Sequence, residues 1–246
     1  MKIDIFEVCA GSVQDCINAE LGGADRVELN SALYLGGLTP SLAMLNLVKE
    51  KTSLKVICMN RPRAAGFCYD DVEIETMFKD AEILLENGAD GISFGFLNPD
   101  ATINITHTKK MVELIHRYRK EAVFHRAFDC VSDPYVAIQQ LIDCGVDRIL
   151  TSGLQPTALQ GCELLNNLQF KFGERVEILA GSGINVDNIE TLRERTGIHQ
   201  FHGSCKTWRK DPTTTLGNIS YAYHEKDDYD CVSTTNVLQV VQLLKK

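Results

Sequence analysis

One short phrase recurs along this chain of 246 residues and constrains its fold more than any other feature. In each copy a glycine ends a helical stretch, a short turn follows, and an apolar strand begins. Glycine suits the left-handed position after a helix, and short, apolar, β-branched strands are typical of parallel sheets. The repeat therefore predicts alternating helices and parallel strands. The copies are GGADRVEL (22–29), NGADGISF (87–94), CGVDRILT (144–151) and, more faintly, TGIHQFHG (196–203).

The remaining segments complete a set of eight strands in one domain spanning residues 1–246. Helical periodicity separates the strands, for example over residues 72–86 and 105–120, and a last helix is predicted at about 235–245. Eight strand–helix units indicate an α/β fold, the (β/α)8 TIM-like barrel. A doubly wound sheet is the alternative, but it rarely needs eight evenly spaced repeats. The predicted strands are residues 3–8, 26–30, 55–60, 91–95, 122–126, 148–152, 176–181 and 199–203.

Two predicted loops exceed the usual connection lengths. One covers residues 30–40, and the other runs from 204 to 234 after the eighth strand. Loops this long are usually functional, and both follow a strand, so both are expected at the C-terminal end of the barrel. Aromatic residues in the second loop favour an interface or a lid. The alternative is a flexible acidic loop, because this segment also contains HEKDDYD (224–230).

Composition argues against several classes of function. A formal net charge of −8 disfavours a sequence-independent nucleic-acid binder, because neutralising phosphates requires a cationic surface. No apolar run approaches the ~20 residues of a membrane span, and MKIDIFEVC shows no signal-peptide pattern. Nine scattered cysteines without a CxxC pair fit small buried side chains better than a disulfide framework. We therefore expect a soluble, cytoplasmic protein with neither nucleic-acid nor membrane partners.

Charged residues gather at the C-terminal ends of the predicted strands, where TIM-like barrels place their active sites. Because a buried charge must be paired, we expect the two glutamates of strands one and two to face the two arginines of NRPR (60–63). A structural ion-pair network that closes the barrel end is the alternative. The candidate catalytic residues are Glu7, Glu28, Arg61, Arg63, His125 and Asp129.

The fifth strand ends in AVFHRAFDC (122–130), which places an imidazole and a cation side by side. Strand alternation sends His125 and Arg126 to opposite faces, so both cannot point into the barrel. We predict that His125 faces the mouth and that Arg126 pairs with a carboxylate, for which Asp129 across the turn is the candidate.

Glycine-rich turns follow strands six, seven and eight, as TSG, AGSG and HGS. Backbone N–H groups in such turns commonly hold phosphate in barrels, so together they predict a site for an anionic group. The alternative is that glycine merely permits tight turns. The candidate ligand-binding residues are Thr151, Ser152, Gly153, Gly181, Gly183 and Ser204.

Six segments together resemble the CutC family, which is named for copper homeostasis. They lie between residue 6 and about residue 204: EVCAGSVQDCINAELGGADRVEL, GGLTPS, RPR, FHRAFD, DRILTSG and AGSGI. The resemblance implies a TIM-like barrel, a cytoplasmic location, a homo-oligomer (a dimer or a tetramer), and a role in copper tolerance or Cu(I) binding.

The chain departs from the family pattern at two places. Family members typically carry Cys where this chain has Asn30, and that position and Cys9 are the thiols usually proposed to hold Cu(I). The family's RPRGGDF is RPRAAGF here, so an acidic residue is missing beside Gly66. Because Cu(I) favours at least two soft ligands, Cys9 remains the candidate metal ligand and needs a second soft group.

Two functions follow from these observations. The first is a copper-homeostasis protein that binds Cu(I), that is Cu+, through cysteines. The second is an enzyme acting on a small phosphorylated or otherwise anionic metabolite. In that enzyme Arg61, Arg63 and the glycine turns would hold the anion, and His125 would transfer a proton, since its ordinary pKa lies near neutral.

Overall fold

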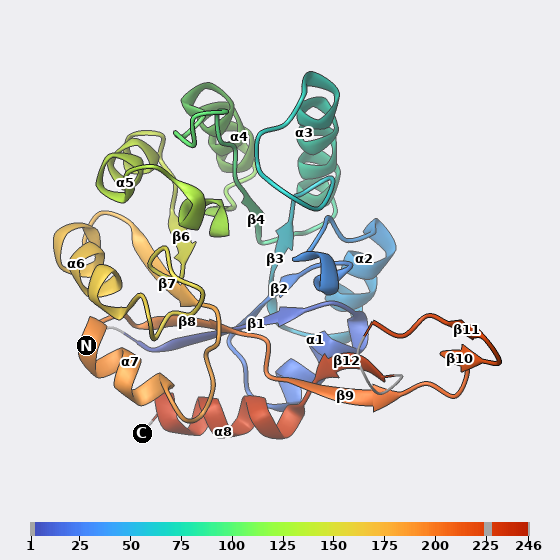
Figure 1. The fold of residues 1–246 in the computed structure, drawn as a ribbon. Helices are drawn as coiled ribbons and strands as arrows, with labels where there is room; N and C mark the ends of the chain where they lie inside the picture. The colour runs from blue at the N-terminus through green and yellow to red at the C-terminus, as the bar shows by residue number, and fades with distance from the viewer. Residues whose placement is uncertain (1–2, 224–227, 246) are drawn as a thin grey trace.

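Eight parallel strands close into a barrel in the computed structural model, which describes residues 3–223 and 228–245 (Figure 1). Each strand pairs with the next in sequence, and β8 pairs back with β1. The predicted (β/α)8 TIM-like barrel is therefore confirmed. The strands are β1 (Ile5–Ala10), β2 (Arg26–Leu29), β3 (Lys55–Met59), β4 (Gly91–Phe94), β5 (Glu121–Phe124), β6 (Arg148–Thr151), β7 (Glu177–Gly181) and β8 (Gln200–Gly203).

Helices surround the barrel and cover the outward side chains of its strands (Figure 1). The three helices whose bounds the sequence predicted, α3, α4 and α8, are confirmed to within about three residues. None of the helices in the described ranges is long and apolar enough to cross a membrane. The helices are α1 (Val13–Leu21), α2 (Leu42–Lys51), α3 (Asp71–Glu86), α4 (Ile105–Arg117), α5 (Pro134–Asp143), α6 (Cys162–Phe172), α7 (Ile189–Thr196) and α8 (Thr234–Leu244).

The repeated sequence segment has a structural role at the N-terminal ends of the even-numbered strands. Its glycine has a positive φ in every copy, at Gly23, Gly88, Gly145 and Gly197. In the three full copies, the aspartate that follows accepts a hydrogen bond from a backbone N–H of the preceding strand. These bonds are Phe6 N to Asp25 Oδ2 (2.9 Å), Val56 N to Asp90 Oδ2 (3.0 Å) and Ala122 N to Asp147 Oδ2 (2.7 Å). Each aspartate thus joins an odd strand to the next even one.

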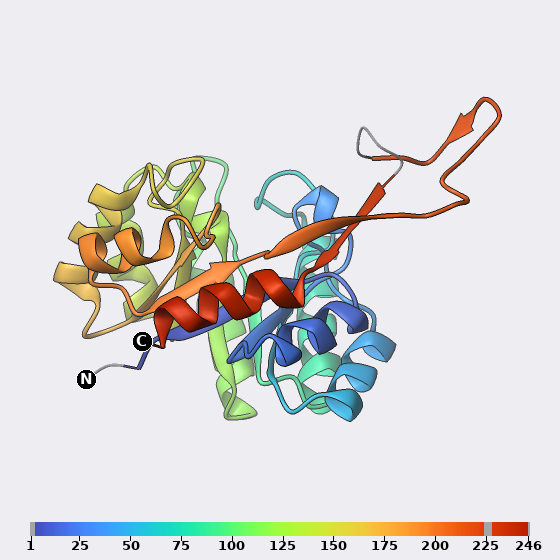
Figure 2. The same ribbon diagram turned by 90° about the horizontal axis from the view of Figure 1, so that it is seen from below.

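The segment predicted as a long loop over residues 204–234 is instead an arm built of paired strands. β9 (Lys206–Lys210) pairs antiparallel with β12 (Asp228–Val232), and β10 (Thr215–Leu216) pairs with β11 (Ile219–Ser220) farther out. Figure 2 shows the arm extending away from the barrel. Residues 224–227 of the acidic cluster lie outside the described residues, so that part of the flexible-loop alternative is not addressed.

The base of the arm is fixed to α1 by buried hydrogen bonds. Asn18 donates through Nδ2 to the Val232 carbonyl at 2.9 Å, and the Val232 N–H donates to Asp15 Oδ1 at 2.7 Å. The arm therefore begins from a rigid base beside the mouth of the barrel.

The other predicted loop, residues 30–40, folds back on itself. A bridge joins Ser31 to Leu38, and a short 3-10 helix, η1 (Leu33–Leu35), lies between them. This brings Leu33 and Gly36 over the C-terminal end of the barrel, where they contribute to the wall of a cavity.

Candidate functional site

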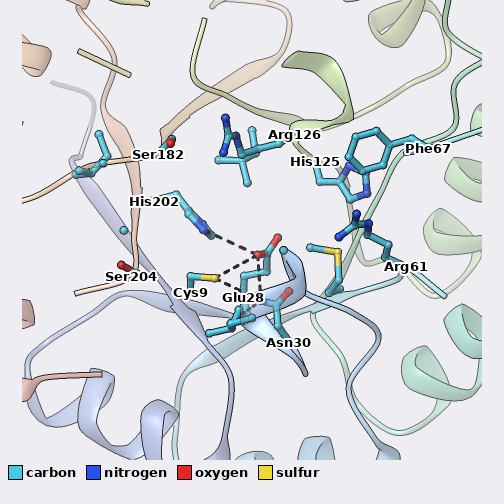
Figure 3. A pocket seen from close by; sticks show the side chains of 17 residues that line it. Cys9, Glu28, Asn30, Arg61, Phe67, His125, Arg126, Ser182, His202 and Ser204 are labelled. Atoms are coloured by element: carbon cyan, nitrogen blue, oxygen red, sulfur yellow. Dashed lines mark hydrogen bonds and ion pairs between the residues drawn. The ribbon is translucent and has the colours of Figure 1, made fainter. Parts of the chain in front are cut away.

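A cavity of about 260 Å³ lies at the C-terminal end of the barrel. Strand ends and the loops that follow them supply its walls, so residues distant in sequence converge there (Figure 3). One wall carries a thiol, a carboxylate and an imidazole from β1, β2 and β8. The other carries an arginine and a second histidine, from the segments after β3 and β5.

The first wall is formed by Cys9, Glu28 and His202. Cys9 is in register with Glu28 on the neighbouring strand, and parallel pairing of β8 with β1 brings His202 beside them. Glu28 Oε2 lies 3.9 Å from both Cys9 Sγ and His202 Nε2. The three possible ligand atoms all lie within 4.8 Å of one another, a spacing that would let one metal ion contact all three. We call this group the Cys9–Glu28–His202 cluster.

Burial and neighbouring charges set the protonation of this cluster. Burial raises the pKa of the Cys9 thiol. Burial also disfavours protonated His202, but contacts with Cys9 and Glu7 and the charge of Glu28 outweigh it and raise the pKa of His202 well above its ordinary value. The cluster therefore rests as a neutral thiol beside an imidazolium that two carboxylates stabilise.

Asn30 supports the cluster from below in the view of Figure 3. Its Nδ2 donates to Glu28 Oε2 at 3.1 Å and to the Glu28 carbonyl at 3.0 Å, and it lies 3.6 Å from Cys9 Sγ. The side chain that stands where the family resemblance places a second thiol is thus an amide that orients Glu28 beside Cys9.

The opposite wall contains Arg61, Phe67 and His125. The Arg61 guanidinium lies over the Phe67 ring, 5.2 Å from its centroid, and the His125 ring packs on the same phenylalanine with a centroid separation of 5.0 Å. Both polar side chains are almost fully buried, with exposed fractions of 6% and 3%.

His125 is neutral, and its tautomer follows from its contacts. Nδ1 accepts a hydrogen bond from the Ala127 N–H at 3.1 Å, so the single ring proton resides on Nε2. Burial, and then the charge of Arg61, lowers the pKa of His125 to about 3. The group is therefore a hydrogen-bond donor through Nε2 at neutral pH, and not a cation.

The expected pairing of Glu7 and Glu28 with Arg61 and Arg63 is wrong. Glu7 forms a close ion pair with Arg26 on the next strand and lies 2.7 Å from His202 Nδ1, in the barrel interior. Arg26 and His202 outweigh the effect of burial and hold the pKa of Glu7 below its usual range.

Arg63 has its partner elsewhere, outside the cavity. It pairs with Glu73 at the start of α3, where Nη2 lies 3.1 Å from Glu73 Oε2, and it stacks on Tyr69. Pro62 separates it from Arg61 in a turn, so the two arginines of NRPR point to different places.

The predicted pairing of Arg126 with Asp129 is confirmed, with Nε 2.8 Å from Oδ2. The expectation that strand alternation keeps His125 and Arg126 from facing the same space is wrong, because both line the cavity. β5 ends at Phe124, and the chain turns into a 3-10 helix, η2 (Arg126–Cys130), so alternation no longer applies.

Asp129 occupies the turn after β6 that the sequence assigned to an external anion. Its carboxylate accepts hydrogen bonds from Thr151 Oγ1 (2.6 Å), the Ser152 N–H (2.9 Å) and the Leu154 N–H (3.2 Å), and from Ser152 Oγ (3.0 Å). Gly153 instead donates its N–H to Thr151 Oγ1. In this structure the donors of Thr151, Ser152 and Gly153 are therefore taken up by side chains of the protein itself, and ligand binding by these residues stays a prediction.

The turns after β7 and β8 do reach the cavity. Gly183 and Ser204, two of the candidate ligand-binding residues, line it together with Ser182. Gly181 lies deeper, where a Cβ atom would come 2.6 Å from Leu150 Cδ1, so its lack of a side chain serves packing.

The walls also contain residues that the sequence did not mark as candidates, among them His202, Met59 and Phe67. His202 stands in HQFHG at a position that alternation directs inward, two residues before the predicted site residue Ser204. Strand alternation could therefore have identified His202. No comparable sequence pattern marks Phe67, since it reaches the cavity through an irregular loop.

A second cavity, of about 310 Å³, lies between the barrel and the base of the arm. Cys9, Leu33 and Ser204 line both cavities, and Cys231 of β12 lines the second. Cys9 therefore stands in a wall that separates two spaces.

Comparison with known proteins places these features in context. The model of the family described as CutC matches residues 4–207. A family protein CutC from Treponema denticola is 41% identical, over 99% of this chain and all of its own length. The human copper homeostasis protein cutC homolog is 39% identical, over 83% of this chain and 74% of its own.

Solved structures agree on the fold. A CutC crystal structure from Streptococcus agalactiae superposes with a TM-score of 0.76 at 28% identity, covering 82% of this chain and 99% of that one. Phosphoribosyl anthranilate isomerase from Thermotoga maritima reaches a TM-score of 0.60 at 10% identity, covering 99% of each chain, and this likeness concerns the fold alone.

Proposed function

Because this chain belongs to the CutC family, we propose that it acts in copper homeostasis by binding one Cu(I) ion at the Cys9–Glu28–His202 cluster. The observation that carries the proposal is the convergence of three ligand atoms within 4.8 Å at a cavity wall. Cu(I) is the cargo here, and Cys9 supplies the soft thiolate that it prefers.

The donor set fits a single Cu(I) ion. Neutral imidazole is a good ligand for copper, so His202 would supply the second donor beside Cys9 once the Cys9 thiol and the Nε2 of His202 have each released a proton. Met59 lines the same cavity and offers a thioether of the kind that Cu(I) also accepts. Glu28 is a harder ligand and contributes mainly its negative charge.

The test is a Cu(I) competition titration against a chromophoric chelator under reducing conditions. We expect Cys9→Ser to weaken Cu(I) binding at least tenfold, because it removes the only thiol of the cluster. Cys68→Ser is the matched control, since Cys68 is an exposed free thiol outside the cavity, and it should leave the affinity unchanged. Equal Cu(I) affinity in the natural protein and Cys9→Ser would remove this site from consideration.

We also propose a cytoplasmic location. All nine cysteines, each within the described residues, are free thiols, and reducing compartments keep thiols in that state. Cu(I) is the reduced form of the ion, so the proposed cargo and the thiols require the same conditions.

A second candidate function, an enzyme or binding protein for a small anionic metabolite, is favoured by the other wall of the cavity. Arg61 places a buried positive charge there, and His125 adds a neutral donor. These two residues are independent of the cluster proposed to bind Cu(I).

A further inference from the structure

Arg61 is a buried cation whose hydrogen bonds go only to neutral groups. Its Nη1 donates to the carbonyls of Leu35 (3.2 Å) and Gly37 (3.1 Å), and Nη2 donates to the carbonyl of Ala65. Among the described residues no carboxylate forms an ion pair with it, and its Nε has no hydrogen-bond partner. A buried charge without a counter-ion is costly, so this position favours an incoming negative group.

His125 also has a buried donor without an acceptor, although its ring is neutral. Its Nδ1 is satisfied by Ala127, but no described group accepts a hydrogen bond from Nε2. A buried donor left without an acceptor destabilises the structure, and a ligand oxygen would supply the missing acceptor.

The two donors belong to one place. Arg61 and His125 line the same cavity and pack on the same Phe67 ring (Figure 3). Together they hold two buried, unpartnered N–H groups and one positive charge beside this cavity. A carboxylate has two oxygens and one negative charge, and therefore matches this set. A phosphate group carries up to two negative charges and three free oxygens, which is more than these two N–H groups and one positive charge can match.

We propose that Arg61 and His125 form a binding subsite for the carboxylate group of a small metabolite. The subsite deepens the second candidate function and does not rest on copper. The cavity volume of about 260 Å³ limits the ligand to a few carbon atoms beyond the carboxylate. Met59, Phe67 and Leu150 offer apolar contacts for that short body, and Glu28 lies across the cavity to meet a hydroxyl group.

Isothermal titration calorimetry at constant ionic strength tests the proposal, using a panel of 2-hydroxy and 2-oxo acids of three to six carbons. Each acid is compared with its uncharged amide, for example lactate with lactamide, and with inorganic phosphate. We expect at least one acid to bind and its amide to bind at least tenfold more weakly. Binding of phosphate alone, equal binding of acid and amide, or no binding across the panel would each overturn the proposal.

Two substitutions at His125 distinguish the role of its Nε2 donor from that of its Nδ1 contact with Ala127. In His125→Asn the amide oxygen can still accept from Ala127, but the donor at the Nε2 position is lost. In His125→Gln an N–H group can still occupy the Nε2 position. We expect the Asn variant to weaken binding of the acid about tenfold and the Gln variant to retain it. The reverse order would contradict the assigned role of Nε2.

Arg61→Lys and Arg63→Lys form a matched pair two residues apart. Arg63 pairs with Glu73 outside the cavity, so its substitution should leave the titration unchanged, whereas Arg61→Lys removes Nε and should weaken binding of the acid at least tenfold. If Arg61→Lys does not fold, because its carbonyl contacts hold two loops, the two His125 variants decide the matter alone.

Discussion

Asn30 shows how one side chain sets the character of the site. Its amide orients Glu28 beside Cys9, where the family resemblance places a cysteine. An amide nitrogen is a poor ligand for Cu(I), so the natural protein offers a single thiol at this wall.

We predict that Asn30→Cys binds Cu(I) at least tenfold more tightly than the natural protein, because a second thiolate joins the first. Competition with a Cu(I) chelator measures the change. Asn30→Ser is the control, since it removes the hydrogen bonds to Glu28 without adding sulfur, and it should show no gain. If the cysteine and serine variants bind equally well, the side chain at position 30 does not reach the ion.

For single residues, the sequence predicted which side chains are charged site candidates better than it predicted which residues they pair with. Arg126 and Asp129 are three residues apart across a turn, and their pairing could be predicted locally. Glu7 could not be assigned in that way, because Arg26 and His202 reach it only when β2 and β8 close on either side of β1. Charge balance alone predicted that Arg61 and Arg63 pair with the two glutamates. This was wrong, because charge balance does not show how deep in the barrel each side chain lies.

The arm is the element that sequence patterns described least well. Its strands are short, and among the described residues β10 and β11 at its tip pair only with each other, so neither hydrophobic periodicity nor a core marks it. The barrel strands were predicted to within about two residues, because they are apolar runs and a glycine precedes each even-numbered one. At the tip, Leu216 and Tyr221 are each 83% exposed, which is unusual for large apolar side chains far from a core.

We propose that the arm tip contacts a second copy of this chain, and we predict that Leu216→Ser combined with Tyr221→Ser weakens assembly at least tenfold. In the part of the chain that the structure describes, the tip strands β10 and β11 do not join the barrel sheet, so thermal unfolding of the barrel should be unchanged. Analytical ultracentrifugation measures the effect, with Phe170→Ser as the control, since Phe170 on α6 is 87% exposed. Sedimentation of the natural protein as a 27.4 kDa monomer would contradict the proposal.

In the whole molecule, the free energy of unfolding depends on pH through buried ionisable side chains, and each of these acts over a different pH range. His125 is neutral when folded, with a pKa of about 3, against an ordinary value of 6.5. Between these values the unfolded chain binds a proton that the folded chain does not, so stability falls as pH falls. His202, whose pKa is raised, is charged in both states below 6.5 and adds no slope there. Glu7 has a lowered pKa, and its contribution is lost only below its ordinary value of 4.5.

We predict that His125→Asn has a flatter dependence of stability on pH than the natural protein. As the pH falls from 6.5 toward 5, the free energy of unfolding should fall less steeply than in the natural protein, by a difference that approaches about 1.4 kcal/mol per pH unit, because one proton uptake is removed. Urea denaturation at several pH values measures both slopes, with His116→Asn as the control on the surface. Identical slopes for the natural protein and His125→Asn would show that the buried imidazole titrates normally.

Cys9 stands in the wall between the barrel cavity and the cavity beneath the arm. A side chain in such a partition has two routes of approach. A metabolite that fills the barrel cavity closes one of them and leaves the route beneath the arm open. Under the two proposals above, a Cu(I) ion would therefore have a route to the thiol that does not pass through the barrel cavity, although Glu28 and Met59 are assigned to both ligands.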